Sequence, residues 1–348
     1  MELGAAALFI GYGLYNLGIE NKFKKSVEKT SQDYAVSPLT FTGERFLPSA
    51  RGELWSEHWH RYHYVLPFVA GKVVLDCASG EGYGTALMAS QAAQITGVDV
   101  SHDAVKHARA TYATVRNCTY VCASATALPM ADHSVDVVVS FETIEHVDAA
   151  AQLQFMAEIA RVLRPDGLLI MSSPNKAEYT DKRHFDNTFH VREMYAQEFA
   201  DLLTPHFAHQ FWLGQKNQFV SRIEPISVET PVIRASSGML AESITVSQAA
   251  PAIIVESLPP IYYVVLCAKN ADVLAAATRQ VRLSSFTDSE EWAYNDYSSA
   301  YRELNANRVR LAQLEAENAA LKAQLASTAK PGKQTGFFGR LFSDLKQK

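Results

Sequence analysis

The chain contains little cysteine and no excess of positive charge, and each shortage excludes a class of protein. Its 348 residues include only four cysteines, and no two of them have the C-x-x-C spacing of a zinc or redox site. We therefore expect no metal site. We interpret Cys77, Cys118, Cys122 and Cys267 as small apolar core residues in a reducing compartment. A net charge of −5 argues against a nucleic-acid-binding surface, which needs a basic stripe.

Long apolar runs are scarce as well. The uncharged run from Leu3 to Ile19 has 17 residues, at the lower limit for crossing a bilayer, and glycines interrupt it. Lys22, Lys24 and Lys25 follow the run, so the positive-inside rule keeps the rest of the chain in the cytoplasm even if the run inserts. A membrane anchor, a secretory signal and a loosely packed extension stay open as interpretations. The signal is disfavoured because no basic residue precedes the run.

A buried strand that leads into a small-residue loop is the most informative pattern in the chain. Val73 to Leu75 supply the aliphatic run of a central parallel strand, and Gly80 and Gly82 follow it closely. These glycines are expected to remove Cβ atoms that would keep a ligand from the next helix. A second strand, Ile95 to Val98, ends in Asp99, 19 residues after Gly80 (99 − 80). This spacing is typical of a Rossmann-type unit whose acid binds ribose hydroxyls.

The order of the acid and the glycines separates two families of nucleotide-binding loops. Asp76 precedes the glycines in the order D-x-x-x-G-x-G, whereas a dinucleotide-binding loop has the order G-x-G-x-x-G. The pattern resembles motif I of class I S-adenosylmethionine-dependent methyltransferases. Their cofactor carries a sulfonium, an amino group and a ribose in place of phosphates, so an acid is favourable there.

The resemblance implies an α/β fold: a Rossmann-like seven-stranded methyltransferase sheet with helices on both faces. We expect a C-terminal coiled-coil helix to follow it, from the heptad pattern described below. The resemblance also implies S-adenosylmethionine as the cofactor. Two positions depart from the usual pattern, Ala78 in place of a glycine and Ser124 in place of an aspartate, and we expect both to be tolerated, Ala78 with a negative φ. The resemblance assigns cofactor binding to Asp76, Ala78, Gly80, Gly82, Asp99, Val100, Ser124, Ala125, Phe141 and Glu142.

Further matches extend the resemblance over roughly residues 41–270 and point to one subgroup of the family. The segments T-G-E-R-F (42–46), H-R-Y (60–62) and F-H-V-R-E (189–193) are similar to a bacterial subgroup linked to surface-polysaccharide synthesis. This implies a sugar or glycan end as the methyl acceptor. A hydroxyl acceptor profits from a base, and by family position the candidate catalytic residues are His190, His146 and Glu193. The candidate substrate-binding residues are Arg45, Arg61, Tyr62 and Arg192. We interpret residues 58–62 either as a cluster that closes over the cofactor or binds an anionic acceptor through Arg61, or as a helix whose aromatic face packs on the sheet.

The remaining residues divide into appendages around this domain. We expect an N-terminal extension (1–35), a helical cap (36–66), the methyltransferase domain (67–272) with an insertion near the acceptor site (217–260), a linker helix (273–300), a coiled coil (301–328) and a basic amphipathic tail (329–348).

The coiled coil and the tail predict partners. Residues 301–328 place leucines at most heptad positions, and at the first apolar position Asn318 is the single asparagine among leucines. This pattern is typical of a parallel two-stranded coil and predicts a homodimer. A helix packed on its own domain is the alternative. The tail carries a net charge of +4 (5 − 1) beside apolar residues, which favours the inner face of the plasma membrane or a polysaccharide-synthesis enzyme.

Two other functions stay open at this stage. One is a small-molecule methyltransferase that acts on a quinone or lipid precursor. The other is a scaffold with a vestigial methyltransferase fold that recruits enzymes through the coil and the tail.

Overall fold

The computed structural model describes residues 53–217, 245–247, 250–254, 259–281, 283–284, 286 and 292–328. The chain forms two compact units, Met1–Glu290 and Glu291–Lys348, and each is considered by itself. Arg45, the N-terminal extension, most of the insertion and the tail therefore lie outside the described residues.

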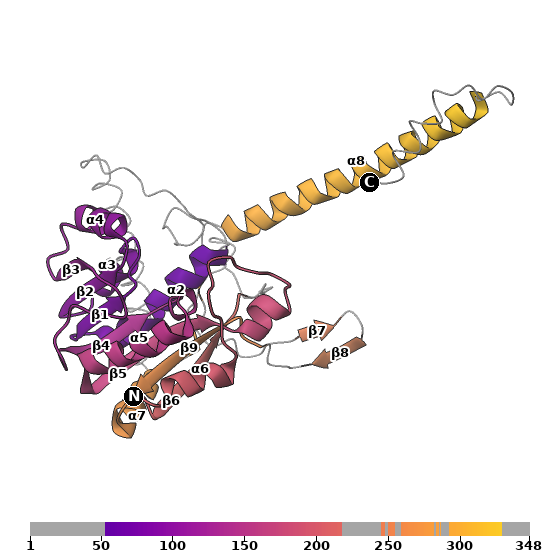
Figure 1. Ribbon diagram of the computed structural model, residues 1–348. Coiled ribbons are helices and arrows are strands. Elements are labelled where there is room, and N and C mark those ends of the chain that lie inside the picture. Colours follow the sequence, from indigo (N-terminus) through magenta and orange to yellow (C-terminus); the bar gives the residue numbers. More distant parts are fainter. Residues whose placement is uncertain are drawn as a thin grey trace, which may run out of the picture. The chain divides into compact units, whose positions relative to one another are not determined.

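The first unit is built on a seven-stranded sheet with the strand order β3-β2-β1-β4-β5-β9-β6 (Figure 1). Strands β1 to β5 run parallel, and β9 is antiparallel to both of its neighbours. This confirms the predicted Rossmann-like seven-stranded sheet. The strands are β1 (Val73–Cys77), β2 (Gln94–Asp99), β3 (Cys118–Cys122), β4 (Val135–Ser140), β5 (Leu163–Pro174), β6 (His209–Gln215) and β9 (Tyr262–Ala268).

Helices cover both faces of the sheet and bury a separate apolar cluster on each. One cluster joins the sheet to α2 (Glu53–Val69), α3 (Tyr83–Met88), α4 (His102–Thr111) and α7 (Ala271–Thr278). The other joins it to α5 (Ala149–Val162) and α6 (Ala196–Leu203). Neighbouring strand residues alternate between the two clusters, as Val74 and Leu75 do in β1. Burial on both faces explains why the central strands are almost continuously apolar.

Short elements follow the carboxyl ends of two central strands. A 3-10 turn, η1 (Ile144–His146), follows β4, and a π-helical turn, η2 (Ala177–Asp181), follows β5. A two-stranded antiparallel sheet, β7 (Thr245–Ser247) with β8 (Ala250–Ile254), lies within the predicted insertion.

The interpretation of all four cysteines as core residues is wrong for one of them. Cys77 and Cys267 are buried, Cys118 is half-buried, and Cys122 is exposed. Cys122 ends β3, and β3 is an edge strand, so this position has a neighbouring strand on one side only. The sequence pattern predicted that Cys122 lies in a strand, but it did not predict that this strand is at the edge of the sheet.

The second unit contains α8 (Trp292–Thr328), which continues without a break through the segment predicted as a coiled coil. No glycine or proline occurs in these residues, so nothing in the backbone interrupts the helix. The segment predicted as a linker helix, 273–300, comprises the end of α7 and the start of α8, because α7 ends at Thr278. Within the described part of the chain, no helix is both long enough and apolar enough to cross a membrane.

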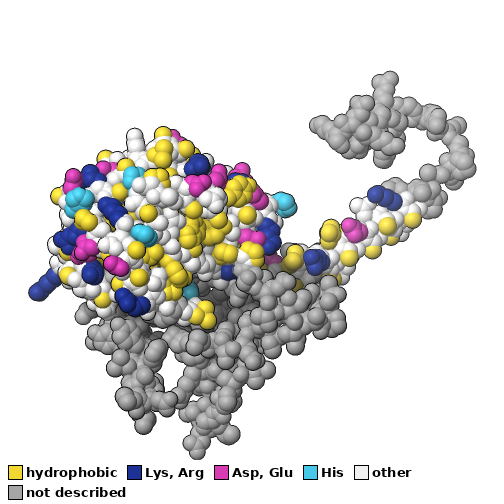
Figure 2. Space-filling view, turned by 90° about the horizontal axis from the view of Figure 1, so that it is seen from below, with side chains coloured by type: hydrophobic (Ala, Val, Ile, Leu, Met, Phe, Trp, Pro, Cys, Tyr) yellow, Lys and Arg dark blue, Asp and Glu magenta, His cyan; other side chains and the backbone are white. Residues whose placement is uncertain are grey.

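On the face shown in Figure 2, the charged side chains of both signs are interspersed over the described residues. Among these residues, no basic stripe is visible on that face.

Candidate active site

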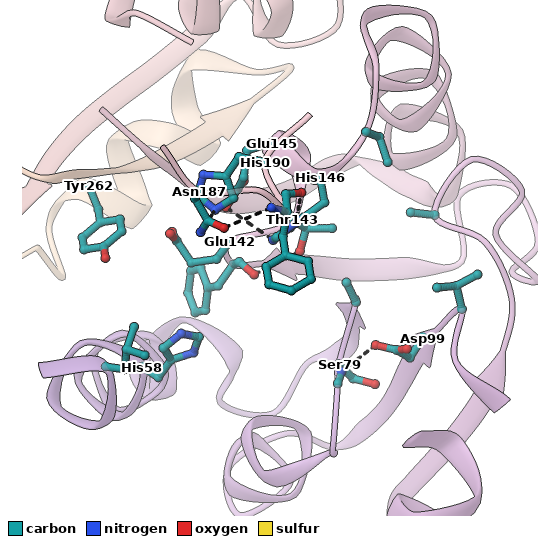
Figure 3. Close-up of a pocket in the computed structure, with 18 of the residues that line it drawn as sticks. His58, Ser79, Asp99, Glu142, Thr143, Glu145, His146, Asn187, His190 and Tyr262 are labelled. Carbon is teal, nitrogen blue, oxygen red and sulfur yellow. Dashed lines mark hydrogen bonds and ion pairs between the residues drawn. The ribbon is translucent and has the colours of Figure 1, made fainter. Parts of the chain in front are cut away.

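A cavity of about 820 Å³ lies at the carboxyl ends of β1, β2 and β4 (Figure 3). Its walls include the loop Ala78–Gly80, Asp99 with Val100, and the residues that follow β4. The far side is formed by η1 and by residues 183 and 185–190. Open α/β sheets bind ligands at this edge, so the cavity occupies the expected place.

Asp99 lies in the cavity wall, and two backbone N–H groups hold its carboxylate in place. Its Oδ2 accepts a hydrogen bond from the backbone N–H of Gly80 at 2.8 Å, and its Oδ1 accepts one from the N–H of Ser101 at 2.8 Å. Gly80 adopts the left-handed conformation, with a φ of 56°. Carboxylate oxygens can each accept more than one hydrogen bond, so the Asp99 carboxylate is chemically suited to ribose hydroxyls.

Most of the predicted cofactor-binding residues line this cavity. Those in its wall are Ala78, Gly80, Asp99, Val100, Ser124, Ala125, Phe141 and Glu142. Asp76 and Gly82 are not among its lining residues.

Asp76 lies behind the loop, fully buried. One carboxylate oxygen accepts from the Thr85 hydroxyl at 2.5 Å and the other from the Tyr62 hydroxyl at 3.3 Å. Burial raises the pKa of Asp76 to about 7, although both hydroxyl groups act to lower it. The predicted direct grip on a cofactor is therefore corrected: this side chain ties α2 and α3 together beneath the glycine loop.

Gly82 serves helix packing and does not open a path for a ligand, which corrects a second expectation. A Cβ at Gly82 would lie 2.7 Å from Cε1 of Tyr120. A Cβ at Gly84 would lie 2.2 Å from Cζ of Tyr62. Both glycines therefore allow aromatic rings of the core to pack against the start of α3.

Two residues of the cavity wall, Ala78 and Glu142, have strained backbone conformations. The expectation of a negative φ at Ala78 is wrong, because this residue has a φ of 65°. Glu142, across the cavity after β4, has a φ of 48°. The left-handed conformation costs a residue with a Cβ roughly 1–2 kcal/mol. Strain of this kind concentrates at functional sites, where the surrounding structure holds it in place.

The predicted catalytic residues lie together on the far side of the cavity. Nδ1 of His190 lies 2.5 Å from a carboxylate oxygen of Glu193, and the other oxygen of Glu193 accepts from the Thr180 hydroxyl at 2.5 Å. The ring of Tyr179 stacks on His190. An imidazole that donates from Nδ1 to a carboxylate carries its lone pair on Nε2. With its proton on Nδ1, His190 would present the lone pair of a general base on Nε2.

His146 lies next to His190, with the two rings perpendicular and their centroids 5.1 Å apart. Its Nδ1 lies 3.0 Å from the backbone carbonyl of Phe189. Glu145, the preceding residue of η1, is fully buried and lines the same cavity. Burial raises the pKa of Glu145 well above its ordinary value. Figure 3 shows the three side chains close together.

The predicted substrate-binding residues are not brought together. Tyr62 lines the cavity, but Arg61 is buried beside it, 3.7 Å from Glu142 and hydrogen-bonded to Gln215 at 2.8 Å. Arg192 bonds to Gln152, outside the cavity lining. Tyr62 and Trp59 belong to the apolar core, as in the alternative interpretation of residues 58–62.

The sequence did not predict a polar network around Glu57, a residue of the cavity wall. Burial raises the pKa of Glu57 to about 7, even though the neighbouring Arg61 lowers it. Glu57 accepts a hydrogen bond from Tyr262 at 3.0 Å and from Asn217 at 3.0 Å. These residues come from segments more than 150 residues apart, and no local pattern connects them.

The fold, the glycine loop and Asp99 resemble those of class I S-adenosylmethionine-dependent methyltransferase domains. In agreement, residues 75–171 match the family model described as a methyltransferase domain. A probable S-adenosylmethionine-dependent methyltransferase of Mycobacterium tuberculosis is 41% identical over 171 residues, which is 47% of this chain and 60% of the relative. One from Mycolicibacterium smegmatis is 39% identical over 173 residues, 48% and 64% of the two chains. The chain thus spans about three fifths of the length of these relatives.

The chain is also similar to a solved S-adenosylmethionine-dependent methyltransferase of Thermotoga maritima. The two are 17% identical with a TM-score of 0.43, over 61% of this chain and 89% of that one. S-adenosylmethionine is the cofactor of the domain class, and the acceptor capacity of Asp99 suits its ribose.

Proposed function

We propose that the protein is an S-adenosylmethionine-dependent methyltransferase that methylates a hydroxyl of a sugar or glycan end in bacterial envelope polysaccharide synthesis. One observation carries the proposal: a single cavity has the fixed acid Asp99 on one side and the His190–Glu193 pair on the other. A site for the methyl donor therefore adjoins a group that can accept a proton.

On the donor side, the chain binds and orients. Asp99 would hold the ribose, while Val100, Ala125 and Phe141 would flank the adenine, as their places in the cavity wall allow. The bound cofactor supplies an electrophilic methyl group on a sulfonium, and transfer breaks its carbon–sulfur bond as the new carbon–oxygen bond forms. The protein contributes alignment and exclusion of water.

On the acceptor side, His190 would remove the proton of the attacking hydroxyl. Nε2 takes the proton, and the carboxylate of Glu193 stabilises the imidazolium that results. Asn187 contacts Nε2 at 3.0 Å and must move aside for the acceptor. General-base catalysis by a positioned histidine contributes about 10²–10⁴-fold in rate.

The lining of the acceptor side supports a polyhydroxylated substrate. Aromatic rings alternate there with charged and amide groups, which can accept from and donate to several hydroxyls. The residues are Tyr179, Arg183, Phe185, Asp186, Asn187 and Phe189. The link to envelope polysaccharides itself rests on the subgroup resemblance of the surrounding segments.

The appendages support a place at a membrane-associated assembly. We infer that α8 pairs with a second copy through residues 301–328, because its leucines are 45–59% exposed where they are described, at Leu304, Leu311, Leu314 and Leu321. The tail, 329–348, lies outside the described residues. Its composition supports cytoplasmic residence with attachment to the inner leaflet or to a synthesis enzyme.

Transfer of a tritiated methyl group into fractionated envelope extracts tests the proposal. We expect label in the polysaccharide fraction, reduced at least about 100-fold by His190→Asn and unchanged by His102→Asn, an exposed histidine of α4. Label confined to quinone or lipid precursors would contradict the glycan acceptor. A chain that neither labels any fraction nor binds the cofactor would be a scaffold, and the enzymatic proposal would fall.

A further inference from the structure

Three metal-ligating side chains meet at the acceptor end of the cavity. Glu145 and His146 come from η1, and His190 comes from the segment that follows η2. Each offers one ligand atom, and these atoms all lie within 4.8 Å of one another. Figure 3 shows the three side chains converging on one region of the cavity wall.

Glu145 is buried without the contacts that a buried carboxyl group normally has. It is 0% exposed, and within the described residues neither of its carboxylate oxygens takes part in a hydrogen bond. Buried polar groups are nearly always paired, because desolvation is costly otherwise. Nε2 of His146 lies 4.0 Å from Oε1 of Glu145.

The backbone around Glu145 fixes the position of this carboxyl group. The carbonyl oxygen of Glu145 accepts hydrogen bonds from the N–H groups of Val191 and Arg192 at 2.8 and 2.9 Å. These two bonds tie η1 to the segment that carries His190. The close approach of the three side chains is therefore a property of the fold.

Both imidazoles are oriented as metal ligands usually are. His146 directs Nδ1 to the carbonyl of Phe189, and His190 directs Nδ1 to Glu193. A metal-bound histidine commonly donates its other ring N–H to a carbonyl or carboxylate in this way. Asn187 keeps its amide oxygen on the N–H of Phe189 and so presents its NH₂ group to Nε2 of His190, which marks Nε2 as the atom with the lone pair.

We propose that Glu145, His146 and His190 bind a divalent first-row transition-metal ion. Two imidazoles and one carboxylate form a ligand set that proteins use for such ions with coordination positions left open. Ligand atoms about 2.1 Å from an ion lie roughly 3.4 Å apart in a tetrahedron. The three ligand atoms lie within 4.8 Å of one another, so the pairs need to approach by up to about 1.4 Å. Asn187 gives up its contact with Nε2 when the ion binds.

This ion gives the cluster a defined role, and that role rests on the proposed function. An acceptor hydroxyl at an open position would have its pKa lowered by the metal, so its proton can leave to solvent water. The oxygen then attacks the methyl carbon, and the electron pair of the broken carbon–sulfur bond stays on sulfur. His190 acts as a ligand in this state, and the ion replaces it as the activating group.

The expectation of no metal site is replaced by this proposal. It was based on cysteine spacing alone, whereas these ligands are oxygen and nitrogen atoms from two segments more than 40 residues apart.

Titration of the untagged full chain with Co²⁺, followed by visible absorption, tests the site without donor or acceptor. We expect one Co²⁺ per chain. Glu145→Gln and His146→Asn should each weaken binding at least about tenfold, the lower limit for disturbing a metal site, while His102→Asn leaves it unchanged. Thermal unfolding of each variant shows whether it is folded, and Glu145→Gln preserves the shape of the side chain.

Two results would overturn the site: a wild-type chain without saturable Co²⁺ binding, or folded Glu145 and His146 variants that bind Co²⁺ as the wild type does. Calorimetry with S-adenosylmethionine on the same preparations separates this outcome from failure of the proposed function. Cofactor binding without Co²⁺ binding removes the metal site alone. Co²⁺ binding without cofactor binding removes the methyltransferase function and leaves the site.

Discussion

The carboxylate of Asp99 accepts a hydrogen bond from the backbone N–H of Gly80 at 2.8 Å. This bond joins the end of β2 to the loop after β1. In the sequence, these two segments are recognised by separate patterns, the glycines and the acid. It also orients a carboxylate that lines the cavity. The glycine loop and the acid therefore form one rigid unit, and the side chain of Asp99 is prepared for a ligand before one arrives.

The buried carboxyl group of Asp76 should make stability depend on pH. Burial raises its pKa to about 7, so the folded state binds this proton more tightly than the unfolded state, in which the pKa is about 4. Its contribution is fully present below about pH 4 and is lost as pH rises through about 7. Urea unfolding should show that the stability of the wild type relative to Asp76→Asn falls across this range.

The comparison with Asp76→Asn isolates this group, because Glu57, with a pKa also raised to about 7, remains in both proteins. The exposed Asp166→Asn serves as the matched control and should follow the wild type at every pH. A constant difference between wild type and Asp76→Asn from pH 4 to 8 would show that Asp76 ionises normally.

Relief of the strain at Ala78 should stabilise the protein. With a φ of 65°, Ala78→Gly removes a penalty of roughly 1–2 kcal/mol but adds up to about 1 kcal/mol of unfolded-state entropy. We expect a net gain of up to about 1 kcal/mol in the free energy of unfolding. The same change at Ala157, exposed in α5, should cost about 1 kcal/mol. Equal losses at both positions would contradict the strain at Ala78.

The pairing of α8 predicts a two-chain mass in sedimentation equilibrium. Leu311→Asp would place a charge in the apolar seam and should weaken association at least about tenfold. Ala316→Asp, on the opposite side of the heptad, should leave the mass unchanged. A wild type that sediments as a single chain would favour a helix without a second copy. The heptad positions are Leu304, Leu311, Asn318 and Leu325, with Asn307, Leu314, Leu321 and Thr328.

The sheet could be predicted because its signals are local. The run Val73–Leu75 and the acid at Asp99 each follow from a few neighbouring residues, and β1 and β2 are found there. The backbone at Ala78 could not be predicted, since its φ depends on how the loop is held between β2 and α3. The position of Asp76 behind the loop could not be predicted either. The alternation of residues along a strand shows that an acid is buried but does not show which side chains it contacts.

The sequence predicted several residues of the candidate site but not which of them contact one another. His146 and His190 stood out by family position, but their convergence on Glu145 depends on a turn after β4 that brings two segments together. Arg61 was predicted to bind an acceptor, whereas its charge is directed to Glu142 and Gln215 inside the wall. Such pairings arise from tertiary packing, which the spacing of residues along a chain does not reveal.

The central claim is that Asp99 holds the methyl donor. Isothermal titration of S-adenosylmethionine into the wild type, Asp99→Asn and Asp166→Asn tests it most directly. Loss of hydrogen bonds to a charged group costs about 1.5–3 kcal/mol, so Asp99→Asn should bind at least about tenfold more weakly, with Asp166→Asn unchanged. A folded Asp99→Asn chain that binds the cofactor as tightly as the wild type would contradict the account.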